Sequence, residues 1–365
     1  GMIWNEIRKI WNLRSFFLVM VVGITLMYSW VVGQLNLNNL PLFETVQLEI
    51  GAQLQKNFGD SLDERELEEV RGLYEEAKEK LDEKVFTIWP ELRQKGYETY
   101  EAFEQEVTTV YEGEETQKKD WELYEEIVER CGWELETRDT YVSILATAGN
   151  PISVLPYQVT MNMSYVMGDY FWILSILVLL LVLPYLTVDN RSGVYQVVAV
   201  TRIGRKWIVR QIVVMLVSVL ALLFVCSLGF YIVYRIMTPY EPFQHCLVPG
   251  LWFDWTWQQY FWIQVIMINL GALALAMVFF FLSSRCRTIV GTVVVAIPCW
   301  GAGAVLSMNF YNQLFTISCD GTFYSNTIGR LKSLPFVAEA VLLGIGVLLL
   351  VLLYRRRLKE DIQEA

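Results

Sequence analysis

The sequence predicts an all-α membrane protein with six transmembrane helices and an extracellular helical bundle. The spans are indicated by six apolar runs, at residues 15–33, 170–188, 211–234, 258–282, 288–308 and 335–354. Each run has about the 17–25 residues that a helix needs to cross the hydrocarbon layer. A helix is expected because hydrocarbon offers no partner to backbone polar groups, which must then be satisfied within the segment.

The distribution of basic residues predicts the orientation of the spans. Fourteen Lys and Arg residues lie before the first span, between spans two and three, between spans four and five, and after span six, whereas the short loops on the other side hold only three. Cytoplasmic loops carry the excess of Lys and Arg, so both termini are expected in the cytoplasm and residues 355–365 form a cytoplasmic tail. The simplest location is a bacterial plasma membrane. An organelle membrane stays open, although nothing resembles a transit peptide.

An acidic insertion of residues 34–169 separates the first two spans. It holds twelve Lys and Arg against thirty Asp and Glu, a net charge of −18, and since the whole chain carries −10 the remainder carries +8. A loop longer than about 60 residues does not influence the orientation rule, so the acidity is compatible with an extracellular position. The acidity could attract cationic peptides, or it could serve only to keep a helical surface soluble.

The insertion is expected to fold as a small antiparallel bundle without strands. Ser61 and Glu64 have the spacing of a capping box, which marks the start of a helix. Trp89-Pro90 is expected to end this helix, because proline restricts the residue before it. Between them, a narrow apolar face is formed by Leu67, Val70, Tyr74, Ala77, Leu81, Val85 and Ile88. Two further apolar patterns, at residues 97–110 and 121–131, predict a second and a third helix.

Residues 2–14 predict an amphipathic helix in the cytoplasmic interface of the membrane. Three isoleucines and two tryptophans at helical spacing form its apolar face, and Glu6, Arg8 and Lys9 fall largely outside that face. Aromatic side chains favour the headgroup layer and cations favour anionic lipid, so this helix is expected to bind membrane lipid. A plain cytoplasmic extension of the first span at 15–33 is the alternative.

The loop between the second and third spans carries the most specific pattern in the chain. An acidic residue is followed by a cation and a glycine, then by a short apolar segment, and then by a turn with glycine and cations. The residues concerned are Asp189, Arg191, Gly193, Val194, Val197, Arg202, Gly204, Arg205 and Lys206. Asp189 or Asn190 has the side chain to cap a short helix beyond it. The cations would hold the turn at lipid headgroups.

This loop resembles the coupling loop of type-2 ATP-binding-cassette (ABC) exporter permeases, and the six-span order and the interfacial N-terminal helix resemble that family too. The resemblance covers the membrane part and not the insertion, and aspartate stands at 189 where the family usually has glutamate. It implies that residues 189–210 form a coupling loop on which an ABC ATPase subunit docks. It also implies a dimer with a second permease copy or homologue. A basic loop that only fixes topology is the alternative.

ATP binding is not expected in this chain, which is predicted not to be an enzyme by itself. No Gly-x-x-x-x-Gly-Lys-Ser/Thr loop occurs, so ATP and Mg would be bound by the separate ATPase subunit and this chain would hold no cofactor. One histidine and six dispersed cysteines predict neither a metal site nor a catalytic set. A disulfide between Cys246 and Cys319 and free thiols are both compatible with the sequence. Nucleic acid is not expected as a partner.

Candidate positions for a substrate path are polar, small and helix-bending residues in or beside the predicted spans. They are Asn269, Gly271, Pro298, Gly301, Gly303 and Phe310. Small residues allow helices to approach closely and proline kinks a helix, so packing and bending explain most of these residues equally well. Only Glu339 is ionisable within a predicted span, which argues against a self-powered secondary transporter.

The sequence therefore predicts the permease subunit of an ATP-driven exporter that moves a peptide, a lipid or a hydrophobic compound outward. One alternative is ATPase-driven transmission of movement to extracellular partners without transport, which the insertion favours and the six spans disfavour. Another alternative is a membrane-anchored sensor or immunity protein that binds an antimicrobial peptide on its acidic insertion. That protein would need neither the coupling loop nor an ATPase.

Overall fold

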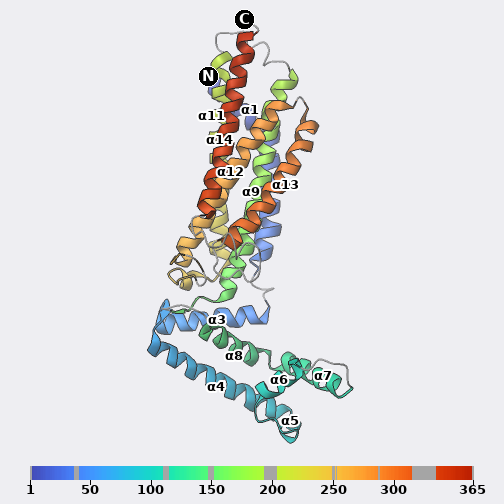
Figure 1. Cartoon of the computed structure of the whole chain (residues 1–365), viewed down its shortest axis with the longest axis vertical. Helices are drawn as coiled ribbons and strands as arrows, with labels where there is room; N and C mark the ends of the chain where they lie inside the picture. Colours follow the sequence, from blue (N-terminus) through green and yellow to red (C-terminus); the bar gives the residue numbers. More distant parts are fainter. Residues whose placement is uncertain are drawn as a thin grey trace.

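The structure consists of a bundle of long helices with a smaller helical domain at one end. This computed structural model describes residues 2–36, 41–109, 115–146, 152–192, 204–248, 251, 253–286, 288–314 and 334–363. Both termini lie at the same end of the bundle, and the smaller domain lies at the opposite end (Figure 1). We refer to these as the terminal end and the domain end of the bundle.

The bundle is built from helices that are apolar over most of their length. Its elements are α2 (Leu13–Leu26), which continues as the π-helix η1 (Met27–Val32), α9 (Tyr157–Ser192), α11 (Gly204–Met237), α12 (Trp257–Arg285), α13 (Ile289–Leu314) and α14 (Leu334–Gln363). Within the described residues, five apolar stretches are long enough to cross a membrane: Leu13–Val32, Asn162–Thr187, Trp207–Met237, Trp257–Arg285 and Phe336–Arg357. They give the chain the character of a membrane protein and match five of the predicted spans.

The remaining predicted span, residues 288–308, falls on α13. The apolar stretch described there, Ile289–Gly303, is shorter than the other five, so this span stays a prediction. The second span differs from the prediction at its start. Helix α9 begins at Tyr157, and its apolar stretch begins at Asn162 instead of residue 170. Several methionine and valine side chains before residue 170 are buried, so the apolar face continues through the predicted boundary.

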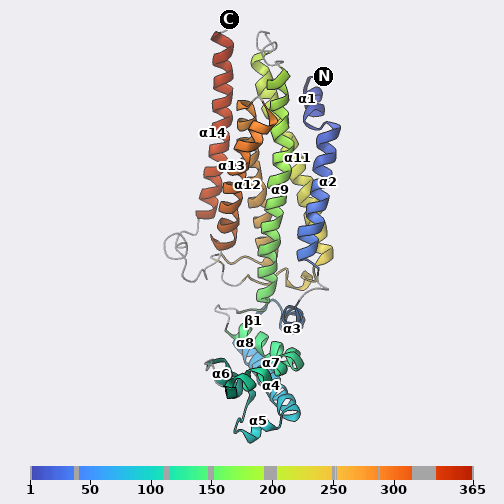
Figure 2. The same cartoon turned by 90° about the vertical axis from the view of Figure 1, so that its right-hand side faces the viewer.

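Helix α9 forms the centre of the bundle. It contacts α2, α11, α12 and α13. Of the 18 most apolar consecutive residues of α9, 72% are buried. The corresponding share is 17% in the stretch that begins with α2 and 22% in α14. These two helices lie at the edges of the bundle (Figure 2). Both expose apolar side chains. Such surfaces are stable against lipid tails, which are as apolar as the side chains themselves.

The smaller domain, residues 41–155, is called the acidic domain below. Its described helices are α3 (Leu42–Phe58), α4 (Glu64–Ile88), α5 (Glu91–Gln94), α6 (Tyr100–Thr109), α7 (Glu115–Arg130) and α8 (Gly132–Leu145). Strand β1 (Ser61–Leu62) pairs antiparallel with β2 (Ile152–Ser153), so the prediction of a domain without strands was wrong. This strand pair joins the segment between α3 and α4 to the end of the domain.

The capping box of α4 lies two residues beyond its predicted position. Ser61 belongs to β1, and Asp63 is the cap. The Asp63 carboxylate accepts a 2.8 Å hydrogen bond from the Glu66 backbone, and the Glu66 carboxylate accepts one of 2.8 Å from the Asp63 backbone. The helix ends before Trp89-Pro90 as predicted.

The acidic domain contains two hydrophobic cores. Near the bundle, side chains of α3, the first half of α4 and the end of α8 share one continuous core with the long helices, and we call this part the proximal lobe. Farther away, the second half of α4 packs with α5, α6, α7 and the start of α8, and we call this part the distal lobe. Its buried residues are Leu81, Val85, Phe86, Trp89, Leu92, Tyr100, Phe103, Ile127, Cys131 and Leu135.

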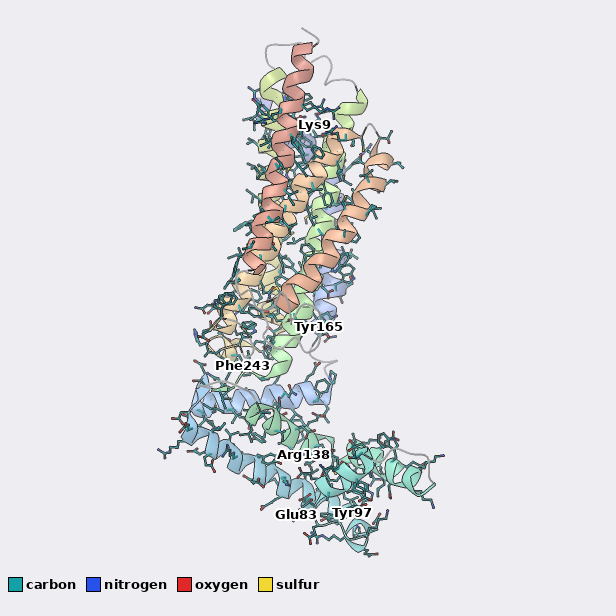
Figure 3. The ribbon with its side chains drawn as sticks, in the orientation of Figure 1. Lys9, Glu83, Tyr97, Arg138, Tyr165 and Phe243 are labelled. Atoms are coloured by element: carbon teal, nitrogen blue, oxygen red, sulfur yellow. The ribbon has the colours of Figure 1, made fainter. Side chains whose placement is uncertain are left out.

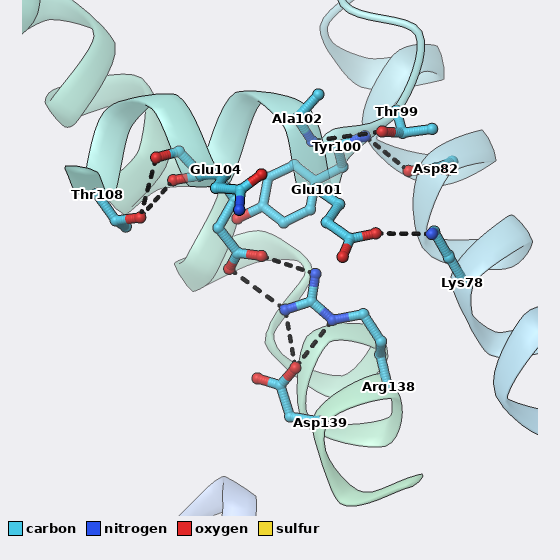
Figure 4. Close-up of polar contacts among 11 residues, drawn as sticks. Lys78, Asp82, Thr99, Tyr100, Glu101, Ala102, Glu104, Thr108, Arg138 and Asp139 are labelled. Carbon is cyan, nitrogen blue, oxygen red and sulfur yellow. Dashed lines mark hydrogen bonds and ion pairs between the residues drawn. The ribbon is translucent and has the colours of Figure 1, made fainter. Parts of the chain in front are cut away.

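Buried charge holds the helices of the distal lobe together (Figure 4). Arg138 on α8 is 7% exposed. Its guanidinium donates two hydrogen bonds to the Glu104 carboxylate of α6, at 2.8 and 3.3 Å, and pairs with Asp139 at 2.8 Å. The carboxylate of Asp82 on α4 accepts the first backbone N–H of α6 at 2.8 Å. Three helices are therefore tied together by charged side chains.

Helix α3 lies across the domain end of the bundle (Figure 1). Its Gly51 permits a close approach, because a Cβ there would lie 2.4 Å from Pro156 Cγ and 3.3 Å from the Phe243 ring. Figure 3 labels Phe243 at this junction. Nearby, Cys246 is a buried free thiol. Cys319, its partner in the predicted disulfide alternative, lies outside the described residues.

Candidate functional site

The candidate site lies at the terminal end of the bundle, where three helices meet. Helices α1 (Met2–Ile10), α9 and α11 each contribute two side chains that are three or four residues apart, and hence on one face of the helix. The six residues are Glu6, Lys9, Tyr185, Asp189, Trp207 and Gln211. We call them the α1–α9–α11 cluster, and Figure 3 labels Lys9 within it.

Helix α1 packs on the bundle with part of its apolar face. Ile10 is buried, whereas Ile3 and Trp4 are exposed. Asn12 then ends the helix and caps α2, since its side-chain oxygen accepts a 2.9 Å hydrogen bond from the backbone N–H of the residue three positions on. Lys9 faces α9 and not lipid, contrary to the prediction for the cations of this helix, because a buried carboxylate on α9 requires a cation.

Asp189 is that carboxylate. It is 4% exposed and forms an ion pair with the Lys9 ammonium. Gln211 Nε2 donates a 2.8 Å hydrogen bond to its other oxygen. Burial raises the pKa of the Asp189 carboxyl, and the hydrogen bond and positive charge of Lys9 oppose the rise. Leaving a buried carboxylate without partners is strongly destabilising, so this residue ties the three helices together.

Glu6 forms the second half of the cluster. The Tyr185 hydroxyl donates to one of its carboxylate oxygens at 2.8 Å, and Trp207 Nε1 donates to the other at 3.2 Å. The Lys9 ammonium lies 5.9 Å from the Tyr185 ring centroid and 5.5 Å from that of Trp207, within the range of cation–π attraction. Glu6 and Lys9 therefore join α1 to both α9 and α11.

Asp189 is the one predicted coupling residue whose side chain the structure describes. It lies inside α9 and does not cap a following helix as predicted. Arg191 lies in the last turn of α9, and Gly204, Arg205 and Lys206 begin α11, but the side chains of these three cations lie outside the described part. The predicted coupling residues outside the described chain are Gly193, Val194, Val197 and Arg202.

Sequence reasoning missed the partners of Asp189. A usable signal was present, because each helix carries two of the cluster residues at helical spacing beside an apolar face. That signal does not say which helices meet. Lys9 is far from Asp189 in the sequence, and several other cations were equally eligible to pair with it.

Among the predicted path residues, Asn269 takes part in a polar network inside the bundle. Its side-chain nitrogen donates a 2.8 Å hydrogen bond to Ser227 Oγ, and the Tyr170 hydroxyl lies 2.9 Å from the same oxygen. The network links α12, α11 and α9. Phe310 lies in α13, with its side chain outside the described part.

The other predicted path residues lie on different surfaces. Gly271 is buried in α12. Gly303 of α13 packs against Leu275, where a Cβ would approach the leucine methyl to 3.0 Å. Pro298 is exposed on α13, and a Cβ at Gly301 would meet nothing within 4 Å. Gly303 therefore packs at one face of α13, whereas Pro298 and Gly301 lie where the helix is open.

No protein-family model, no curated protein and no solved structure matches the chain. What the site can do follows from its geometry. The α1–α9–α11 cluster joins the two helices on either side of residues 193–203 to one amphipathic helix. Its ion pair and hydrogen bonds hold the three helices together.

Proposed function

We propose that this chain is the permease subunit of an ATP-driven ABC exporter in a bacterial plasma membrane, with both termini in the cytoplasm and the acidic domain outside. It works as a dimer with a second permease copy or homologue. Separate ATPase subunits bind ATP and Mg and dock on residues 189–210. The cargo is a peptide, a lipid or another hydrophobic compound that moves outward.

The α1–α9–α11 cluster is the observation that carries this proposal. Residues 193–203 connect α9 to α11, and the cluster fixes the helix on each side of them through Asp189 and Gln211. A soluble subunit that pushes on this connection would move α1, α9 and α11 together, because the buried ion pair resists their separation. Movement at the surface would thus reach α9 at the centre of the bundle.

Exposed apolar surface on α13 supports the dimer. Val290, Val294 and Ile297 follow one face of the helix and are 74%, 65% and 52% exposed. Gly301 continues that face, and a small residue lets two helices approach closely. Because α9 fills the centre of each bundle, a path for cargo would lie between the two copies.

The first test is purification of the chain from its native membranes in mild detergent, with mass spectrometry of the proteins that accompany it. We expect a stoichiometric ABC ATPase. The complex is then compared with two variants that make the same chemical change. Asp189→Asn removes one negative charge from the cluster, and Glu129→Gln removes one from an exposed position on α7.

Asp189→Asn should lower the stimulation of the ATPase by this chain about tenfold, since loss of a buried pair exceeds about 1.4 kcal/mol. Glu129→Gln should leave the stimulation unchanged. If no ATPase accompanies the chain in a preparation that keeps other ABC complexes intact, the proposal fails. It also fails if Gly193→Pro, which distorts the coupling segment, retains full activity.

A second candidate function is the transmission of movement to the acidic domain without transport. It is favoured by α9, a single helix of 36 residues, which is about 54 Å long at about 1.5 Å per residue. One end of α9 carries Asp189, and the other follows the buried Val154 and Leu155, next to β2. ATP turnover that changes hydrogen exchange in α3 and α8, while no compound crosses a vesicle membrane, would favour this function over transport.

A further inference from the structure

A cleft on the side of the bundle has no role in the proposed coupling. It lies between η1, α9 and α13 and has a volume of about 550 Å³, which is within the usual range of small-molecule sites. Its lining residues are Ser29, Trp30, Gly33, Gln34, Asp169, Trp172 and Trp300. None of the predicted path residues is among them.

Asp169 is the charged residue of this lining. It belongs to the apolar stretch Asn162–Thr187 of α9 and is half-buried. Among the described residues it has neither an ion-pair partner nor a hydrogen-bond partner. Ionisable groups within membrane segments are unfavourable unless they are paired, and they mark ligand or ion sites. Asp189, the other carboxylate near an end of α9, has both kinds of partner. Asp169 therefore has no countercharge among the described residues. A cationic ligand can supply one.

Three indole rings line the same cleft. Trp172 and Trp300 meet edge to face with their centroids 4.8 Å apart. Trp300 Nε1 donates a 2.7 Å hydrogen bond to Ser175 Oγ, which fixes the orientation of that ring. Trp30 comes from η1. Indole faces attract ammonium groups more strongly than other aromatic side chains do. A carboxylate among indoles is a combination that recognises an ammonium ion.

The position of the cleft along the bundle indicates the shape of the ligand. Asp169 lies seven residues from Asn162, the end of its apolar stretch, which is about 10 Å along a helix. Trp30 lies near Val32, the end of the first apolar stretch. Both residues are therefore near the boundary of the hydrocarbon layer, where polar headgroups and aromatic side chains are found. A headgroup bound there would leave its apolar chain among lipid tails.

From these observations we infer that the cleft binds the ammonium headgroup of a cationic amphiphile whose apolar chain lies among lipid tails. Asp169 supplies the countercharge, and the indoles of Trp30, Trp172 and Trp300 contact the headgroup. Gln34 supplies a polar group beside them. The site requires neither ATP nor a partner subunit, so it goes beyond the proposed function and stands apart from it.

The test uses the full-length chain in nanodiscs of phosphatidylglycerol, a lipid without an ammonium group, with radiolabelled dodecyltrimethylammonium as the probe and dodecanol as the uncharged probe of equal chain length. The wild type should bind the cation saturably. Asp169→Asn should weaken that binding about tenfold or more, and Trp172→Leu about threefold or more. Asp169→Glu, which keeps the charge, should retain most of the affinity. Glu129→Gln on α7 is the matched control and should bind as the wild type does.

Equal affinity of the wild type and Asp169→Asn for dodecyltrimethylammonium would overturn the inference, and so would saturable binding of dodecanol at the same site. Loss of binding in Asp169→Glu as well would show that a change of packing, and not of charge, is responsible. A two-chain trimethylammonium lipid in the nanodisc identifies the source of the ligand. Displacement of the probe supports a membrane lipid, and retention of the probe supports an amphiphile from water. Binding is measured without ATP, so its failure leaves the proposed function untouched.

Discussion

Replacement of Arg138 by methionine should loosen the distal lobe of the acidic domain. The guanidinium is almost completely buried and forms a two-pronged pair with Glu104. Methionine fills much of the same volume but leaves the Glu104 carboxylate without its cation. The side chain of Glu104 is only 22% exposed, so water replaces the lost partner incompletely.

The expected loss of stability follows from these exposures. Removal of one member of a fully buried pair costs about 3–5 kcal/mol. Glu104 keeps some access to water and the Asp139 side chain is 53% exposed, so we expect a smaller loss of about 2–3 kcal/mol. Since about 1.4 kcal/mol corresponds to a tenfold change in an equilibrium, the distal lobe should open about 30 to 150 times more often.

Cys131 reports this opening, because its free thiol is buried in the core of the distal lobe. The rate at which a thiol reagent modifies Cys131 in the full-length chain, measured by mass spectrometry of the peptide, should rise by the same factor in Arg138→Met. Arg71→Met is the control, since Arg71 pairs with Glu68 on the exposed surface of α4 and contributes little.

The double variant Arg138→Met, Glu104→Leu separates charge from packing. Replacing both members of a buried pair by apolar residues is often nearly neutral, so this variant should protect Cys131 better than Arg138→Met does. If the modification rate in Arg138→Met equals that of the wild type, the reasoning from the buried charge is refuted. If the double variant opens as often as the single one, the lost contact of Arg138 with the Tyr100 ring accounts for the effect instead.

Three further predictions concern other parts of the chain. Lys9→Met should release α1 from the bundle because Asp189 loses its cation, and Asp189→Asn in addition should restore much of the packing; hydrogen exchange of the α1 amides measures both. Gly51→Ala should strain the junction of α3 with the bundle, because its Cβ would lie 2.4 Å from the nearest proline Cγ. We expect a loss of about 1–3 kcal/mol, measured by proteolysis within α3, with Gly72→Ala as a control whose Cβ meets open space. Burial raises the pKa of Asp82, so its contribution to stability is full below its unfolded pKa and is lost as the pH rises through its folded pKa. The stability of α6 from hydrogen exchange should therefore fall with rising pH across that window, and Asp82→Asn should remove this dependence.

The sequence predicted those parts of the acidic domain in which apolar residues recur every three or four positions without interruption. Val70, Ala77, Leu81 and Val85 of α4 are buried at the predicted positions, and the helix ends before the predicted proline. Leu67 and Tyr74 are only partly buried, and Ile88 is 38% exposed. Local patterns were sufficient here because each one acts within a few turns.

Helices α3 and α8 were missed for reasons that are visible in their residues. The buried face of α8 includes Arg138 between Leu135 and Tyr141, so a charge interrupts the apolar period that marks a helix. In α3 the buried Val46, Ile50 and Leu54 follow helical spacing, but Glu44, Gln47, Glu49 and Gln53 lie between and beside them and obscure the apolar pattern. The strand pair is only two residues long on each side and leaves no alternating pattern.

The candidate sites were predictable only in part. Asp189 stood out because it belongs to a local pattern, whereas its partner Lys9 belongs to the N-terminal helix, far away in the sequence. The sequence predicts Asp169 as the last residue of the acidic insertion, directly before the apolar run that begins at residue 170. The structure includes it in the apolar stretch of α9, since the uncharged residues before it are helical too.

Because the acidic domain has two cores, the two halves of α4 belong to different units of cooperative unfolding. Elements that share one buried surface unfold together, so the proximal lobe should melt with the membrane helices and not with the rest of its own domain. A fragment excised at residues 41 and 155 would expose the side of α3 around Gly51, which packs against Pro156 and Phe243 in the whole chain, and would be prone to aggregate. The core of the distal lobe, in contrast, is complete without any residue of the bundle. The part of this chain that can fold apart from the membrane helices is therefore the distal lobe alone, which is smaller than the whole acidic domain.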